Sequence, residues 1–242
     1  MKRNLLTIIC LLFSLPLFAQ MNMSANFQNM HLWRGGEVAD GFVLTTDVSY
    51  TTLNKHLEVG LWGGTNSKGE YKEFNYYATY SSNGFSLTLF DTYNFSDGAT
   101  YNNSQFFNYI PDETGRFLDA TAAYRFSGKF PIMVSWSTVL FGRDRDSLNE
   151  KNRFSTFCYA EYPIYKKDNW VVDVGLGAVF ALNNIDNSAN FYGDKAGIVH
   201  ATLKVSNTVE IANYELPLYM QAMWNPQSDK AYLMLGVQLF SF

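Results

Sequence analysis

Histidine, serine and cysteine are the side chains from which a hydrolytic site or a metal site is most readily built. This sequence has no recognisable motif of either kind of site. It contains three histidines, His31, His56 and His200, and no two of them have metal-ligand spacing. No G-x-S-x-G nucleophile motif is present. We therefore expect no catalytic residue, no metal ligand and no cofactor, and we interpret the histidines as polar side chains of the fold.

Charged side chains are a better guide, because carboxylates that face an aqueous passage concentrate cations and repel anions. Charged residues make up only 17% of the chain. Several lie on the polar phase of segments in which apolar and polar residues alternate. The charged residues that could line such a passage, called candidate lumen residues below, are Arg34, Asp47, Glu58, Glu73, Asp119, Arg125, Glu161, Asp173, Lys204 and Glu215. Acids outnumber bases among them, so we expect a weak preference for cations, with Glu58, Glu73 and Asp119 contributing most.

The segments that carry these charges alternate with a period of two, which is typical of β-strands. In "NWVVDVGLGAVFA", residues 169–181, Asp173 lies on the face opposite the larger apolar residues. Such segments run for about eleven residues, whereas ordinary strands have about five to six and a strand tilted across a bilayer needs about nine to eleven. Aromatic residues begin and end the apolar faces, as Tyr214 and Trp224 do in "YELPLYMQAMW". This is the placement expected at membrane interfaces, so the segments predict membrane-spanning strands.

Segments of this kind recur along the whole chain and predict an all-β fold, a closed antiparallel transmembrane barrel of about twelve strands over residues 20–242. The expected strands are 22–34, 42–51, 56–64, 71–80, 85–94, 116–126, 131–142, 153–165, 169–182, 195–207, 213–225 and 230–242. Short and long connectors alternate between them, as in outer-membrane barrels, although the pattern weakens after the tenth strand. The longest connector runs from Phe95 to Gly115.

The first nineteen residues have the pattern of a secretory signal peptide. Lys2 and Arg3 precede an apolar stretch that ends near Ala19, and this stretch is shorter than the roughly 20 residues of a spanning helix. Cleavage after Ala19 leaves Cys158 as the sole cysteine, which excludes an intramolecular disulfide. The net charge of −4 gives no reason to expect nucleic-acid binding. We expect an exported protein of the outer membrane with membrane lipids as partners.

The chain ends on Phe242, with Phe240 two residues earlier, where most chains end in polar residues. A closed barrel pairs its last strand with its first, so the final residue would lie at the membrane interface. Phe240 and Phe242 are out of phase with the apolar face of their strand, and a β-bulge near Leu239 would bring them into phase. The ending also resembles the terminal signature that the barrel-assembly machinery reads, which implies that machinery as a partner.

The start of the exported chain resembles the TorF-type porin family. The motifs are the aromatic-Arg-Gly element Trp33–Gly35, the G-x-W-G element Gly60–Gly63, and the acidic strand with the aromatic pair Tyr76 and Tyr77. The likeness covers mainly residues 23–94. It implies an outer-membrane barrel and a pore for small solutes.

Two other functions are left open by the residues. A barrel of about twelve strands lies between those filled by side chains and those with an open channel, so a filled barrel serving as a surface anchor or adhesin is an alternative. A lipid hydrolase is less favoured, because Cys158 shares the lipid-facing phase with Thr156 and Ala160, and because the histidines lack a nucleophile motif. The sequence leaves the oligomeric state and the role of residues 95–115 open.

Overall fold

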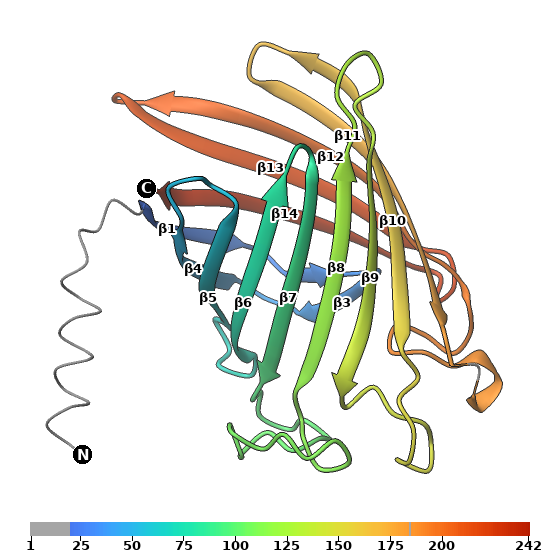
Figure 1. Cartoon of the computed structure of the whole chain (residues 1–242). Helices are drawn as coiled ribbons and strands as arrows, with labels where there is room; N and C mark the ends of the chain where they lie inside the picture. The colour runs from blue at the N-terminus through green and yellow to red at the C-terminus, as the bar shows by residue number, and fades with distance from the viewer. Residues whose placement is uncertain (1–19, 184) are drawn as a thin grey trace, which may run out of the picture.

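The computed structural model describes residues 20–183 and 185–242, so the expected signal peptide lies outside the described residues. In the described part of the chain, twelve antiparallel strands close into one barrel (Figure 1). No described helix is long and apolar enough to cross a membrane. The wall strands are β1 (Gln20–Gln28), β4 (Val43–Thr51), β5 (Leu57–Asn66), β6 (Lys72–Ser82), β7 (Phe85–Asn94), β8 (Phe117–Arg125), β9 (Met133–Gly142), β10 (Ser155–Lys167), β11 (Trp170–Ala181), β12 (Gly197–Ile211), β13 (Tyr214–Asn225) and β14 (Lys230–Ser241).

The predicted fold class and strand number are confirmed, and two boundary predictions are wrong. The first strand ends at Gln28 instead of residue 34, and the chain then forms a separate hairpin of β2 (His31–Trp33) and β3 (Gly36–Ala39). The tenth wall strand, β12, runs on to Ile211, because its ladder with β13 continues as far as Ile211 and Tyr214. Only a two-residue turn then joins β12 to β13, so the alternation of short and long connectors holds there as well.

The two ends of the barrel differ in the length of their connectors (Figure 1). At one end, the turn end, the connectors are residues 52–56, 83–84, 126–132, 168–169 and 212–213. At the other, the loop end, they are residues 29–42, 67–71, 95–116, 143–154, 182–196 and 226–229. Each wall strand pairs with the next in an antiparallel manner, and the number of wall strands is even. The first strand, β1, therefore begins at the turn end, and the last strand, β14, ends there.

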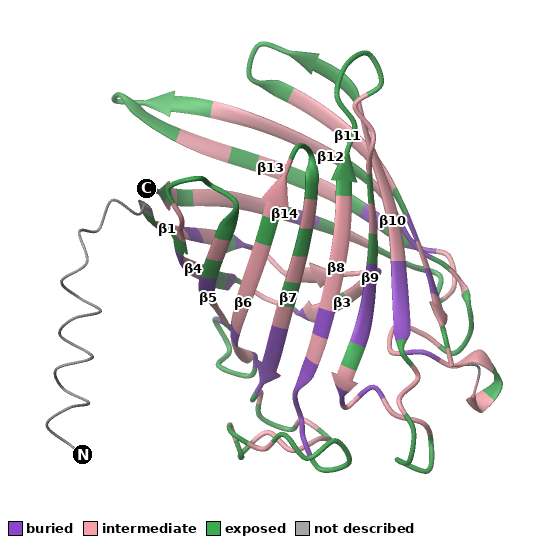
Figure 2. Cartoon of the chain, in the orientation of Figure 1, coloured by how far each residue is buried: buried purple, intermediate pink, exposed green. Residues whose placement is uncertain are grey.

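The wall follows the alternation of the sequence, with large apolar side chains on the outer face and polar ones on the inner face. Leu87 and Leu89 on β7 are 42% and 44% exposed, whereas Thr88 between them faces the lumen and bonds to Thr79 on β6 (2.9 Å between hydroxyl oxygens). Buried residues gather in the loop-end half of β7 to β10 (Figure 2). Some of them, such as Asp91 and Tyr93, face outward and contact Arg116 at the end of the connector 95–116, whereas others, such as Phe157, pack inside the lumen against Tyr192. The loop-end half of the lumen is thus packed with other parts of the chain.

The barrel closes between β1 and β14, and the predicted bulge is confirmed at this seam. Ala25 pairs with Phe240 while the next residue, Asn26, pairs with Gln238, so Leu239 is the extra residue. The bulge turns Phe240 to the outer face, where its ring stacks on that of Phe242 with 5.2 Å between centroids. Two backbone hydrogen bonds with Met23, of 3.0 and 3.3 Å, hold Phe242 to the wall.

Candidate functional site

The β2–β3 hairpin, residues 31–39, crosses the inside of the barrel, and we call it the lumen hairpin. Its tip is Arg34 and Gly35, both with positive φ (44° and 91°). Gly35 lies against the far wall, where its carbonyl accepts a hydrogen bond from Asn225 Nδ2 (2.8 Å). A Cβ atom on Gly35 would lie 2.3 Å from the Val199 carbonyl oxygen, so this contact requires glycine.

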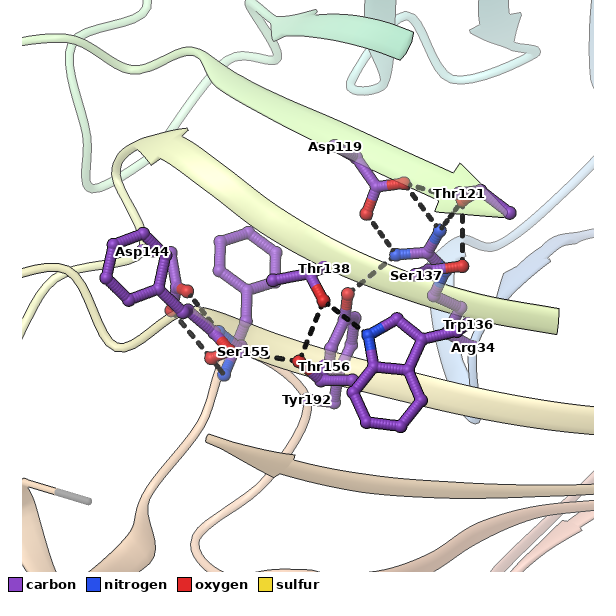
Figure 3. Close-up of polar contacts among 12 residues, drawn as sticks. Arg34, Asp119, Thr121, Trp136, Ser137, Thr138, Asp144, Ser155, Thr156 and Tyr192 are labelled. Carbon is purple, nitrogen blue, oxygen red and sulfur yellow. Dashed lines mark hydrogen bonds and ion pairs between the residues drawn. The ribbon is translucent and has the colours of Figure 1, made fainter. Parts of the chain in front are cut away.

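The side chain of Arg34 fixes the lumen hairpin to β8 (Figure 3). Its Nη1 and Nη2 atoms pair with the two carboxylate oxygens of Asp119 at 2.5 and 2.9 Å, a bidentate geometry. The guanidinium also donates to Thr121 Oγ1 (3.2 Å) and to the hydroxyl of Tyr192 (2.6 Å), and lies over the ring of Trp33 (4.7 Å to the centroid). Only 13% of the Arg34 side chain and 5% of the Asp119 side chain are exposed. This buried ion pair is the main polar link between the lumen hairpin and the wall.

A second set of polar contacts positions Tyr192, which comes from the connector 182–196 (Figure 3). Asp144 accepts hydrogen bonds from the backbone N–H and the hydroxyl of Ser155, both at 2.7 Å. The Ser155 hydroxyl oxygen accepts from the backbone N–H of Phe191 at 2.8 Å. Burial raises the pKa of Asp144, and the hydrogen bonds from Ser155 act in the opposite direction. Together they hold Phe191 and Tyr192 against the ring of Trp33.

A cavity of about 610 Å³ lies beside the lumen hairpin, toward β5 to β8. Aromatic rings, polar wall residues and five charged side chains make up most of its lining. Its residues are His31, Trp33, Arg34, Gly36, Glu37, Val38, Trp62, Glu73, Asn75, Thr88, Phe90, Thr92, Asn94, Phe117, Asp119, Thr121, Arg143, Phe191 and Tyr192. Its size is that of a small-molecule site. The lumen hairpin therefore narrows the lumen and leaves space on one side.

Three of the acidic candidates lie beside bases. Asp119 is paired with Arg34, as described above. Glu161 is 3.3 Å from Arg125 Nη2, and Asp173 on β11 lies opposite Lys204 on β12. These pairs place charges of opposite sign side by side along the wall.

The other acidic candidates have different surroundings. Asp47 and Glu58 share the hydroxyl of Tyr77, whose single proton is within hydrogen-bonding distance of both carboxylates (3.1 and 2.7 Å between oxygens). Glu73 accepts hydrogen bonds from Asn75 and Asn94. Glu215 is exposed at the turn end, where it pairs with Glu210 in the β12–β13 ladder. None of these four carboxylates forms an ion pair with another described residue.

The sequence prediction missed the lumen hairpin, Arg143 and the tyrosines that bind the charged groups. The predicted first strand includes Trp33 and Arg34, although the Gly35–Gly36 pair that follows is a turn signal. That signal could have revealed the hairpin. Arg143 directly follows β9, in a connector that has no alternation to place its side chain. Its position in the lumen could not be inferred from the sequence.

The histidines take part in separate packing contacts. His31 on the lumen hairpin bonds to Gln28 (3.0 Å) and packs beside Trp62, and His56 at the turn end bonds to the carbonyl oxygen of Ser81 (2.7 Å). His200 faces the lumen between aromatic rings of β10. None of the three bonds to a serine hydroxyl in the part of the chain that the structure describes. Cys158 pairs with Trp136 and Ala178 on the outer face.

The long connector, residues 95–116, packs across the rim at the loop end. Its residue Arg116 points to the outer face, where Nη1 is 2.7 Å from Asp91 Oδ1 and Nε donates to the carbonyl oxygen of Phe106 (2.8 Å). Rings of Tyr76, Tyr93, Phe106 and Tyr109 surround the guanidinium at 4.3–5.1 Å. The part of the segment from Phe106 to Arg116 covers the outer wall, whereas Tyr101 packs on Arg143, which lines the cavity.

Comparison with known proteins gives a likeness in fold. No protein-family description and no curated protein matches the sequence, so the resemblance to the TorF-type porins is not confirmed. A structure from a study of the in-meso crystallization of membrane proteins has a TM-score of 0.50 and 11% identity, over 92% of this chain and 83% of that chain. This similarity agrees with the barrel described above.

Two outer-membrane channels are structurally similar at lower scores. The COG4313 outer membrane channel from Pseudomonas putida F1 has a TM-score of 0.45 and 13% identity, over 93% of this chain and 95% of that chain. OccK1 (OpdK) from Pseudomonas aeruginosa has a TM-score of 0.38 and 12% identity, over 93% of this chain. The present chain spans 65% of the length of OccK1.

Proposed function

We propose that the chain is an outer-membrane channel for the passive diffusion of small solutes, with the lumen hairpin as its constriction. The observation that carries this proposal is the cavity of about 610 Å³ beside the hairpin, inside a closed barrel with a polar inner face and an apolar outer face. The loop end would face the outside and the turn end the periplasm, as in outer-membrane barrels. Export would use the signal peptide, and insertion would use the barrel-assembly machinery.

The proposed cation preference is weak, because much of the lumen charge is paired. Arg34 neutralises Asp119, and Arg125 lies beside Glu161. Asp47 and Glu58 share the Tyr77 hydroxyl and have no base beside them; Asp47 lies midway along β4 and Glu58 near the turn end of β5. These two carboxylates supply the excess negative charge that attracts cations, whereas the charge of Glu73 is opposed by Arg143 in the same cavity.

Single-channel recording on the refolded protein tests the proposal. We expect small, steady conductance steps, and a reversal potential across a potassium chloride gradient that has the sign of a cation preference. Anion preference would contradict the charge assignment.

A filled barrel that serves as a surface anchor or adhesin is the second candidate function. It is favoured by the packing of Trp33, Phe117, Phe191 and Tyr192 around the tip of the lumen hairpin. The same recording separates the two functions. Absence of conductance in the wild-type protein, and in a variant in which the Arg34–Asp119 pair is broken, would favour the filled barrel over the channel.

A further inference from the structure

Two opposite charges that face the cavity have no ion-pair partner. The guanidinium of Arg143 makes no hydrogen bond or ion pair with another described residue, and its Nε atom is fully buried without a partner. The carboxylate of Glu73 accepts hydrogen bonds from Asn75 Nδ2 (2.7 Å) and Asn94 Nδ2 (3.1 Å) but contacts no cation. Arg143 and Glu73 attract each other only at a distance beyond an ion pair, so neither charge has a close counter-charge. A partly buried charge without a close counter-charge is costly. A ligand that contacts both groups would reduce this cost.

Apolar surface surrounds the two charges. The Arg143 guanidinium lies 3.8 Å from the ring centroid of Tyr101 and 5.0 and 5.3 Å from those of Phe191 and Phe117. Trp62 and Phe90 line the cavity on the β5 and β7 side. Stacking of this kind holds a guanidinium in place while its N–H groups stay free to donate. The cavity thus offers a cation, an anion and an aromatic wall.

The other charged residues of the cavity do not supply an equivalent site. Arg34 and Asp119 already satisfy each other through a bidentate pair. Glu37 lies on the lumen hairpin and is exposed. Arg143 is therefore the free cationic donor of the cavity among the described residues, and Glu73 is its buried anionic counterpart.

We propose that this cavity binds a small zwitterion with an apolar body, of the class of aromatic α-amino acids. The ligand carboxylate would accept hydrogen bonds from Arg143, its ammonium group would lie at Glu73, and its ring would pack on the aromatic wall. A simple carboxylate or a simple amine would leave one of the two protein charges unmatched. That the ligand is also the transported solute rests on the channel function proposed above, whereas the binding itself does not.

Calorimetric titration of the detergent-solubilised protein with three probes tests this proposal. L-phenylalanine carries both charges, 3-phenylpropionate carries only the carboxylate, and phenethylamine carries only the ammonium group. We expect L-phenylalanine to bind at least about tenfold more tightly than either of the others, because only the zwitterion makes a charged hydrogen bond to both Arg143 and Glu73. Equal affinity for L-phenylalanine and 3-phenylpropionate would overturn the zwitterion assignment in favour of an anion site. Equal affinity for phenethylamine would overturn it in favour of a cation site.

Matched variants assign the charges to residues. R143Q and E73Q should each weaken the binding of L-phenylalanine about tenfold or more, and R143K should fall between R143Q and the wild type. K151Q in the connector after β9 and E70Q in the connector before β6 remove the same charges from exposed positions and should leave affinity unchanged. Heat-modifiable migration on a gel shows that each variant is folded. Wild-type affinity in folded R143Q and E73Q would refute the site, and conductance measured in parallel would show whether the channel function stands without it.

Discussion

The two halves of the barrel are built from the same alternating strands but have different interiors. In the loop-end half, the side chains of Val43 and Val199 have no exposed surface, because the lumen hairpin and the connectors pack on them (Figure 2). In the turn-end half, Arg125 and Glu161 form an ion pair that is partly open to solvent. The difference shows that strand alternation decides only which face a residue occupies. Whether the inner face is buried depends on what other segment enters the lumen.

The same comparison separates two ion pairs of similar chemistry. The side chains of Arg34 and Asp119 are 13% and 5% exposed, whereas those of Arg125 and Glu161 are 52% and 21% exposed. Breaking a buried pair leaves a charge without compensation, which costs about 3–5 kcal/mol. An exposed pair contributes about 0–1 kcal/mol. The loop-end pair should therefore control the position of the lumen hairpin.

The largest expected effect comes from R34Q. Loss of the guanidinium leaves Asp119 buried without a cation, so we expect the lumen hairpin to leave the wall and its backbone amides to exchange at least about a hundredfold faster. Hydrogen–deuterium exchange of residues 31–39 measures this. R125Q at the turn end is the control and should leave exchange in these residues unchanged. Equal protection in R34Q and the wild type would show that the ion pair does not hold the hairpin.

A smaller effect is expected from G35A, compared with G128A at the turn end. Both glycines have a positive φ, 91° and 92°, which an alanine adopts only with backbone strain of about 1–3 kcal/mol. A Cβ at position 35 would also collide with the Val199 carbonyl, whereas nothing lies within 4 Å of a Cβ at position 128. Thermal unfolding should thus show greater destabilisation for G35A. Equal destabilisation of the two variants would contradict close docking of the hairpin tip.

A third comparison concerns one aromatic residue at each end. F242A removes the stacking partner of Phe240, which is worth about 0.5–1.5 kcal/mol, together with the terminal aromatic residue that the assembly machinery is proposed to read. We expect less folded barrel in the outer membrane, measured as the heat-modifiable fraction. F107A at the loop end is the control, because Phe107 is 82% exposed. Phe191 would be a poor control, because its ring packs on Phe117 and Trp33. Similar yields for F242A and F107A would remove the assembly role.

The smallest expected effect is on charge selectivity. Neutralising both carboxylates that share Tyr77, in D47N with E58Q, should lower the cation preference by a measurable shift of the reversal potential, because their charges are not offset by a base. D119N should change selectivity less, because Arg34 already neutralises Asp119. A larger shift in D119N than in the double variant would place the selective region at the loop end.

Much of the wall could be predicted from the sequence. Each wall strand overlaps the predicted segment, the bulge at Leu239 follows from the phase of Phe240 and Phe242, and the connector lengths indicate which end of the barrel carries the loops. These predictions succeeded because alternation with a period of two is a local property of a strand between two different environments. The site was less predictable. Asp119 and Glu73 were identified as lumen candidates, but their partners were not.

The sequence by itself thus determined the barrel, its strands and the inner or outer face of most wall residues. Only the tertiary structure decided that residues 31–39 enter the lumen, that Arg34 meets Asp119 from 85 positions away, and that Arg143 and Glu73 face one cavity without touching. The physical reason is that the first set of features depends on local interactions and the second on contacts between distant parts of the chain. Side-chain alternation is set by the chain's own backbone geometry, whereas contacts across the lumen depend on closure of the whole barrel and on the width that closure leaves.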